Sequence, residues 1–110
     1  VQGEGGFIPM PPEFVDMVWR HWDKGTSRAV LALYRHADPD RLAAAGRDLP
    51  KLTCPSLVVW GDRDPYLPTR FAESYASTLP ASQLELIEGA GHWPWLDDAR
   101  VIDEVLSFVA

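Results

Sequence analysis

Apolar residues recur at three- and four-residue spacing in several stretches of the chain, which is the period of one face of an α-helix. Gly25 separates the first two helical stretches, and we expect Thr26 or Ser27 to cap the second. A shorter helix is expected from 39 to 46, with Asp38 as its cap and Gly46 at its end. The remaining helical stretches are 11–23, 26–37, 69–79 and a last one that follows Asp97 or Asp98.

Two stretches carry a different pattern, which favours β-strands. Residues 56–60 (SLVVW) are a short apolar run rich in β-branched residues and bounded by proline and glycine. Such a run suits a parallel strand that is covered on both faces. Residues 82–89 (SQLELIEG) predict a second strand, and the helix at 69–79 provides the crossover that parallel strands require. The predicted fold class is therefore α/β. In the last helix we expect five residues to face inward: Val101, Ile102, Val105, Leu106 and Val109.

A loop rich in polar and turn residues follows each predicted strand. These loops are GDRDPYLP at 61–68 and GAGHWPW at 89–95. Ligands of open α/β sheets bind at the carboxyl ends of the strands, so we expect Asp62 or Asp64 to lie close to His92. Gly91 is expected to let the chain turn there and present the histidine ring. A carboxylate beside an imidazole orients the ring and stabilises its protonated form, which prepares it to activate a serine, cysteine or water nucleophile.

The segments CPSLVVWGDRDPYLP and LELIEGAGHWPWLDD, each followed by a helix, resemble the C-terminal portion of an α/β-hydrolase-fold enzyme. In that family the acid follows a late strand in a Gly-x-x-Asp pattern, and the histidine follows the last strand in a Gly-His pattern. The resemblance implies that Asp64 is the triad acid and His92 the base, in the family's chain order. It covers roughly residues 53–110. It divides the chain into a helical cap-region remnant at 1–50 and the C-terminal part of the hydrolase core at 51–110.

The nucleophile of that family has no counterpart in this chain. None of the serines has the flanking glycines of a Gly-x-Ser-x-Gly elbow, and Cys54 precedes Pro55 at the start of a strand. The resemblance implies hydrolysis of a small ester-like substrate by a larger enzyme, of which this chain supplies the acid and histidine but is not active alone. Two alternatives stay open. In the first, the enzyme is an epoxide hydrolase or dehalogenase with an aspartate nucleophile. In the second, the chain is a non-catalytic remnant or a self-associating assembly module.

The predicted sheet is too small to close a core by itself, because independent sheets usually need three or more strands. The run at 56–60 would leave an apolar edge exposed, which invites pairing with another chain. We therefore expect the chain to be bound to the missing N-terminal part of the same enzyme or to associate with itself. Its start at Val1, without a methionine, predicts a processed, proteolysed or excerpted polypeptide.

Other residues near the predicted site have simpler interpretations. Asp64 is alternatively a turn residue before Pro65. We expect Asp62 to accept hydrogen bonds from amides of its own turn. Trp93 and Trp95 are expected to pack at the mouth of the site, with Trp93 as the candidate substrate-binding residue. The two other histidines, His21 and His36, are expected on solvated helix faces.

Composition narrows the partners further. The 110 residues carry a net charge of −6, and the basic residues are scattered, which argues against nucleic acid or an anionic membrane as a partner. No apolar run approaches the ~20 residues that span a membrane. Cys54 is the only cysteine, so no disulfide framework is possible, which fits a reducing, cytoplasmic compartment. No cluster of histidine and cysteine has metal-ligand spacing, and no cofactor is expected.

Overall fold

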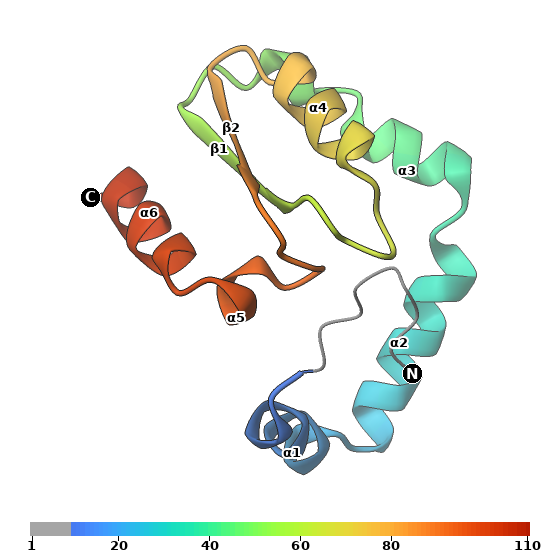
Figure 1. Cartoon of the computed structure of the whole chain (residues 1–110). Helices are drawn as coiled ribbons and strands as arrows, with labels where there is room; N and C mark the ends of the chain where they lie inside the picture. Colours follow the sequence, from blue (N-terminus) through green and yellow to red (C-terminus); the bar gives the residue numbers. More distant parts are fainter. Residues whose placement is uncertain (1–9) are drawn as a thin grey trace. The chain divides into compact units, whose positions relative to one another are not determined.

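The computed structural model describes residues 10–110, which form two compact units, the helical unit (10–49) and the sheet unit (50–110). A short 3₁₀ helix, Leu49–Lys51, lies where one unit gives way to the other. The helical unit contains α1 (Pro12–His21), α2 (Lys24–His36) and α3 (Pro39–Gly46). The sheet unit contains β1 (Ser56–Gly61), α4 (Thr69–Thr78), β2 (Ser82–Ile87), α5 (Pro94–Asp97) and α6 (Arg100–Val109) (Figure 1).

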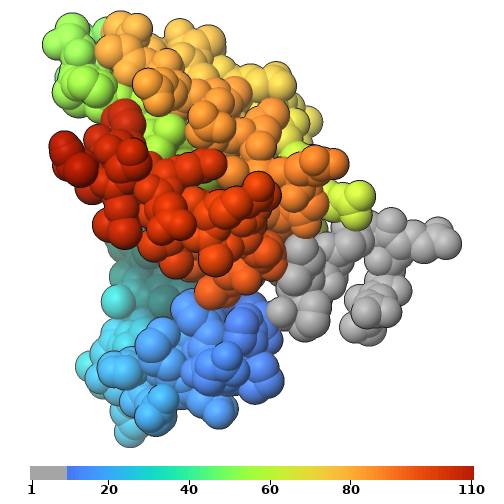
Figure 2. Space-filling model, turned by 60° about the vertical axis from the view of Figure 1, so that its left-hand side comes forward, coloured from blue at the N-terminus to red at the C-terminus, as the bar shows by residue number. Residues whose placement is uncertain are grey.

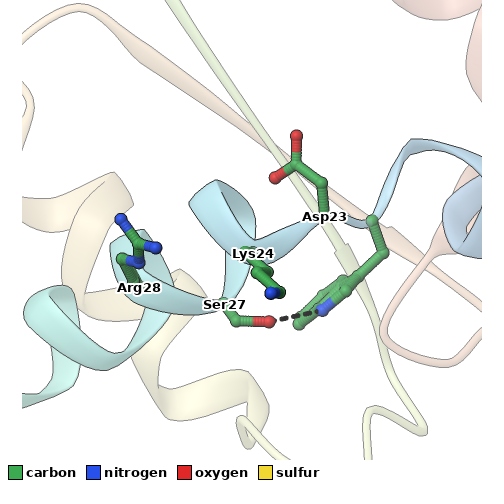
Figure 3. A pocket seen from close by; sticks show the side chains of 5 residues that line it. Asp23, Lys24, Ser27 and Arg28 are labelled. Carbon is green, nitrogen blue, oxygen red and sulfur yellow. Dashed lines mark hydrogen bonds between the residues drawn. The ribbon is translucent and has the colours of Figure 1, made fainter.

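The start of α2 differs from the prediction. The cap is Asp23, whose Oδ1 accepts hydrogen bonds from the Thr26 amide at 2.7 Å and the Thr26 hydroxyl at 3.0 Å. Gly25 consequently lies inside the first turn of α2 and does not separate two helices. The prediction that Thr26 or Ser27 caps this helix was wrong, because the Asp23 carboxylate, about one turn earlier, already accepts a hydrogen bond from a free amide of the first turn. The Trp22 indole donates to the Ser27 hydroxyl at 2.8 Å beside this cap (Figure 3).

The helical unit forms the predicted helices without burying their apolar stripes. Asp38 caps α3 as predicted, since its Oδ1 accepts from the Arg41 amide at 3.0 Å. None of the three helices contains a buried residue. Trp19 and Tyr34 expose 66% and 79% of their surface. The helical period of the sequence therefore predicted the helices of this unit correctly, but the apolar residues on these helices do not form a buried core within the unit.

The two strands of the sheet unit pair in parallel, with Ser56 opposite Ser82 and Gly61 opposite Ile87. This confirms the predicted strand-helix-strand order. Helices α4 and α6 lie on opposite sides of the strands (Figure 1). Successive residues of β1 face these two sides, as the pleat requires. Val59 packs against the buried cluster that includes Val101 of α6, whereas the Trp60 ring lies 6.4 Å from the Tyr75 ring of α4. The apolar strand thus has a helix on each face, as its sequence predicted, but residues 56–60 are only half-buried.

The core of the sheet unit is small and lies near the carboxyl ends of the strands. Ile87, Ala90 and Val101 form its buried cluster, and Ala72 of α4 is also fully buried. Only Val101 of the five residues expected to face inward from the last helix is buried, so that expectation was largely wrong. Two strands offer too narrow a surface for the whole stripe of α6. Figure 2 shows this helix, in red, open to solvent; its exposed apolar residues are Ile102, Val105, Leu106 and Val109.

No helix in residues 10–110 combines the length and the apolar character needed to cross a membrane.

Candidate active site

The loops that follow β1 and β2 are joined by backbone hydrogen bonds. The Asp62 amide donates to the Ile87 carbonyl at 3.1 Å, and the Arg63 amide donates to the Ala90 carbonyl at 2.9 Å. Gly61 allows this approach, because a Cβ on this residue would lie 2.7 Å from the Ala90 carbonyl carbon and still closer to the carbonyl oxygens of Ala90 and Gly91. A residue without a side chain at the end of β1 is therefore what brings the two loops together.

Asp64 uses its two carboxylate oxygens for different contacts. Oδ1 accepts from the amides of Tyr66 at 2.8 Å and Leu67 at 3.0 Å, so Asp64 does organise its own turn. Oδ2 lies 2.8 Å from His92 Nδ1. The predicted proximity of a loop carboxylate to His92 is thus confirmed, and the carboxylate is that of Asp64. The turn contacts and the contact with His92 exist together, because each uses a separate oxygen, and the role of Asp64 as a triad acid stays a prediction.

The charge state of Asp64 follows from these contacts. Its side chain is only 5% exposed, and this burial by itself raises the pKa of the carboxyl. The Leu67 amide, the His92 ring and the Tyr66 amide act against burial and together outweigh it, so the pKa of Asp64 lies below its ordinary value of 3.8. Asp64 is therefore ionised at neutral pH.

An ionised carboxylate only accepts hydrogen bonds, which assigns the tautomer of His92. Nδ1 carries the hydrogen and donates it to Asp64 Oδ2, and in the neutral ring the lone pair is therefore on Nε2. Among residues 10–110 no hydrogen bond occupies Nε2, and the His92 side chain is 32% exposed. The arrangement presents a basic nitrogen to an incoming group while the opposite nitrogen is held by a buried anion. This is the geometry of a general base.

Two aromatic rings hold the imidazole edge-on. The Tyr66 ring lies 5.2 Å from the His92 ring at an interplanar angle of 82°, and the Trp93 ring lies 4.8 Å away at 86°. Edge-to-face contacts of this kind favour one ring orientation. Sequence reasoning missed Tyr66. Its place two residues after Asp64, in the turn that the carboxylate caps, was the available signal.

A cleft of about 250 Å³ opens beside Asp64 and His92 within the sheet unit. Trp95 is one of its walls, whereas Trp93 is not, because the Trp93 ring packs against His92 instead. The part of Trp93 in substrate binding stays a prediction. The other walls are largely apolar, and they include Val59, Leu67, Pro94, Val101 and Val105.

Two details of the histidine loop differ from expectation. The glycine with positive φ is Gly89, at +75°, and not Gly91. Gly91 serves instead as a donor, since its amide bonds Asp97 Oδ2 at 2.8 Å. Asp62 was expected to bond amides of its own turn, but its Oδ1 accepts from the Gly89 amide at 2.7 Å. That expectation was wrong because the close approach at Gly61 puts a second loop within reach.

The other candidates lie away from this site. The Nδ1 atoms of His21 and His36 bond backbone carbonyls four residues earlier on exposed helix faces, as the solvated interpretation predicted. Cys54 is exposed near the start of β1. Within residues 10–110 no group of three or more histidine, cysteine or acidic side chains is arranged to hold a metal ion.

Comparisons with known proteins show the family and the fold of the chain. The sequence profile described as "Alpha/beta hydrolase family" matches residues 2–104. A solved structure of an alpha/beta hydrolase enzyme, from the metagenome of lagoon sediments at Mar Chica, Morocco, superimposes with a TM-score of 0.64 and 27% sequence identity. The superposition covers 87% of this chain and 43% of that one.

Two curated relatives carry names of hydrolases. A pimeloyl-[acyl-carrier protein] methyl ester esterase of Xanthomonas oryzae pv. oryzae is 40% identical over 65 residues, which are 58% of this chain. A 2-hydroxy-6-oxononadienedioate/2-hydroxy-6-oxononatrienedioate hydrolase of Cupriavidus pinatubonensis is 26% identical over 70 residues, which are 64% of this chain. The matches span 26% and 24% of the lengths of these two relatives, so the matched part of the chain corresponds to about a quarter of each.

Proposed function

The chain belongs to the alpha/beta hydrolase family, and from this premise we propose that it supplies the acid and the base of a nucleophile-acid-histidine triad. Asp64 is the acid and His92 the base. The observation that carries the proposal is the 2.8 Å hydrogen bond between Asp64 Oδ2 and His92 Nδ1, made between loops that leave adjacent parallel strands. A buried, ionised partner and an available Nε2 are what this role requires.

In the proposed reaction, His92 Nε2 takes the proton from a hydroxyl nucleophile as that oxygen attacks the carbonyl carbon of an ester. The imidazolium that forms is stabilised by Asp64, which keeps its negative charge throughout. The same proton then passes from Nε2 to the leaving alcohol. In the second half of the reaction, Nε2 activates water in the same way and the acyl group is released as an acid.

We propose a small ester-like molecule as the substrate. The name of the Xanthomonas relative, a methyl ester esterase, supports this class. The apolar walls of the cleft beside His92 also suit a substrate with little charge near the reacting bond. If the nucleophile is an aspartate, His92 Nε2 activates water in the same position, and the reaction is that of an epoxide hydrolase or dehalogenase.

We also propose that the nucleophile comes from a segment outside these 110 residues, which covers the apolar side chains left exposed on the sheet unit. The exposed stripe of α6, and a match to about a quarter of the length of the hydrolase relatives, support this proposal. Self-association of the chain through the same surface is the alternative. Sedimentation of the chain as a folded monomer at micromolar concentration would contradict both.

The proposed function is tested by ester hydrolysis in the polypeptide that carries both these residues and the nucleophile. We expect His92→Ala and Asp64→Asn each to lower kcat by about 10⁴-fold, the size of effect seen when a triad member is lost. His36→Ala is the matched control, because this histidine is exposed in the helical unit and bonds only a backbone carbonyl. Activity of the His92→Ala variant equal to that of the control would refute the assignment.

A further inference from the structure

We propose that Asp62 and Asp97 are positioning residues for His92, each holding one backbone amide of the loop that presents the imidazole. The proposal rests on the proposed function only in giving His92 the role of a base; the contacts that hold its loop do not depend on that role. Neither carboxylate has a hydrogen bond to the His92 ring among the described residues, so neither is proposed to take part in the chemistry.

Asp62 ties the histidine loop to the loop that carries Asp64. Its Oδ1 accepts from the Gly89 amide at 2.7 Å, a contact between residues 27 positions apart in sequence. A length of 2.7 Å is at the short end for an amide donor, as expected when the acceptor is a carboxylate. Asp62 and Asp64 both follow the end of β1. The bond from the Gly89 amide to Asp62 therefore fixes the position of Gly89 relative to the Asp64 carboxylate, which contacts His92.

Asp97 ties the same loop from its other side. It is the last residue of α5, and its Oδ2 accepts from the partly buried Gly91 amide at 2.8 Å. Gly91 directly precedes His92, so this bond restrains the peptide plane from which the histidine extends. A Cβ on Gly91 would lie 3.5 Å from the same Oδ2, so the space beside Gly91 is bounded by this carboxylate.

Between these two amides, Ala90 is 1% exposed and belongs to the buried cluster with Ile87 and Val101. The loop is thus held at three consecutive residues, by a carboxylate, by packing and by a second carboxylate. This matters for His92 because its bond to Asp64 weakens steeply when the geometry departs from linear and short. Without the two carboxylates, the loop would keep the packing of Ala90 and the backbone bond from the Arg63 amide to the Ala90 carbonyl. Neither of these restrains the amides of Gly89 and Gly91, on either side of Ala90, so Nδ1 would be freer to move relative to Oδ2.

The test compares alanine and asparagine variants at both positions in the polypeptide that carries these 110 residues together with the segment proposed above to cover the sheet unit. Asn keeps a side-chain oxygen that accepts from the amide, whereas Ala does not. The readout is the downfield imidazole Nδ1–H signal of His92 in proton NMR, identified by its absence in His92→Gln. We expect Asp62→Ala and Asp97→Ala each to make this proton exchange about tenfold faster, since a hydrogen bond to a charged acceptor contributes at least that factor. Asp62→Asn and Asp97→Asn are expected to retain most of the slow exchange.

Glu88→Ala is the matched control, because this exposed carboxylate is next to Gly89 and has no hydrogen bond to the loop among the described residues. A signal unchanged in both alanine variants would overturn the proposal. Loss of the signal in an asparagine variant that keeps its far-UV circular dichroism would also overturn it, by showing that charge and not the amide bond holds the loop. If an alanine variant unfolds, the folded asparagine variants still decide. No substrate is used, so the result is independent of whether the chain serves a hydrolase.

Discussion

Replacing Gly61 by alanine tests the inference that the two loops meet only because β1 ends in a residue without a side chain. The added Cβ would lie 2.7 Å from the Ala90 carbonyl carbon and closer still to the carbonyl oxygens of Ala90 and Gly91. Non-bonded carbon atoms pack best at 3.5–4.0 Å. The histidine loop must therefore retreat by about 1 Å, because its backbone, unlike a long side chain, has no other rotamer to adopt.

The cost of this retreat is at the upper end of the range for overpacked sites. Inserting a methyl group into a well-packed site costs 1–3 kcal/mol, and backbone neighbours leave little room for relaxation, so we expect about 3 kcal/mol for Gly61→Ala. For a unit of this size each kcal/mol lowers the melting temperature by roughly 4–8 °C, which predicts a loss of roughly 12–24 °C. The Asp64–His92 hydrogen bond is expected to be lost with it.

Two glycines of the histidine loop, Gly89 and Gly91, are matched controls. At Gly91 a Cβ meets only Asp97 Oδ2 at 3.5 Å, an ordinary contact, so Gly91→Ala is expected to change stability by less than about 1 kcal/mol. At Gly89 a Cβ meets nothing, but the φ of +75° costs an alanine roughly 1–2 kcal/mol. Urea unfolding followed by circular dichroism measures all three. Equal losses for the three variants, or a Gly61→Ala variant as stable as wild type, would refute the reasoning.

Two further predictions concern single carboxylates. The pKa of Asp64 is lowered in the folded chain, so its contribution to stability is present above pH 3.8 and is lost as the pH falls below that value. We therefore compare the unfolding free energies of wild type and Asp64→Asn from pH 7 to pH 2.5. The difference between them should shrink across that range and not grow. Asp23→Ala should reduce the helical ellipticity of the chain by unravelling the first turn of α2, whereas Asp23→Ser, which keeps a capping oxygen, should not.

Local patterns were enough to predict most elements of the sheet unit. The apolar run at 56–60, the amphipathic stretch after it and the strand at 82–87 appear in the predicted order, and the parallel pairing follows from the crossover helix. Local patterns failed where a longer-range contact competed. Thr26 and Ser27 were rejected as caps because Asp23 reaches the same amides first, and the stripe of α6 stays exposed because two strands cannot cover it.

The site shows the same division. Topology alone predicted that a carboxylate from 61–68 meets His92, because both loops leave the same edge of a parallel pair. It did not determine whether Asp62 or Asp64 does so, and only the resemblance to hydrolases favoured Asp64. The structure assigns Oδ2 of Asp64 to His92 and Asp62 to the Gly89 amide. Sequence spacing cannot decide between Asp62 and Asp64, which are separated by one residue, because their partner His92 comes from a second loop.

Periodicity and chain order predict the strands, the crossover and the loops, so the set of chemical groups and the edge of the sheet at which they gather follow from the sequence. Which atoms touch follows only from the three-dimensional fold. The edge-on contact of Tyr66 with His92, the glycine at Gly61 as the point of close approach, and the amide bonds of Asp62 and Asp97 all join residues through space. These contacts depend on distances of a few tenths of an ångström between backbones, and no local pattern of residues encodes such distances.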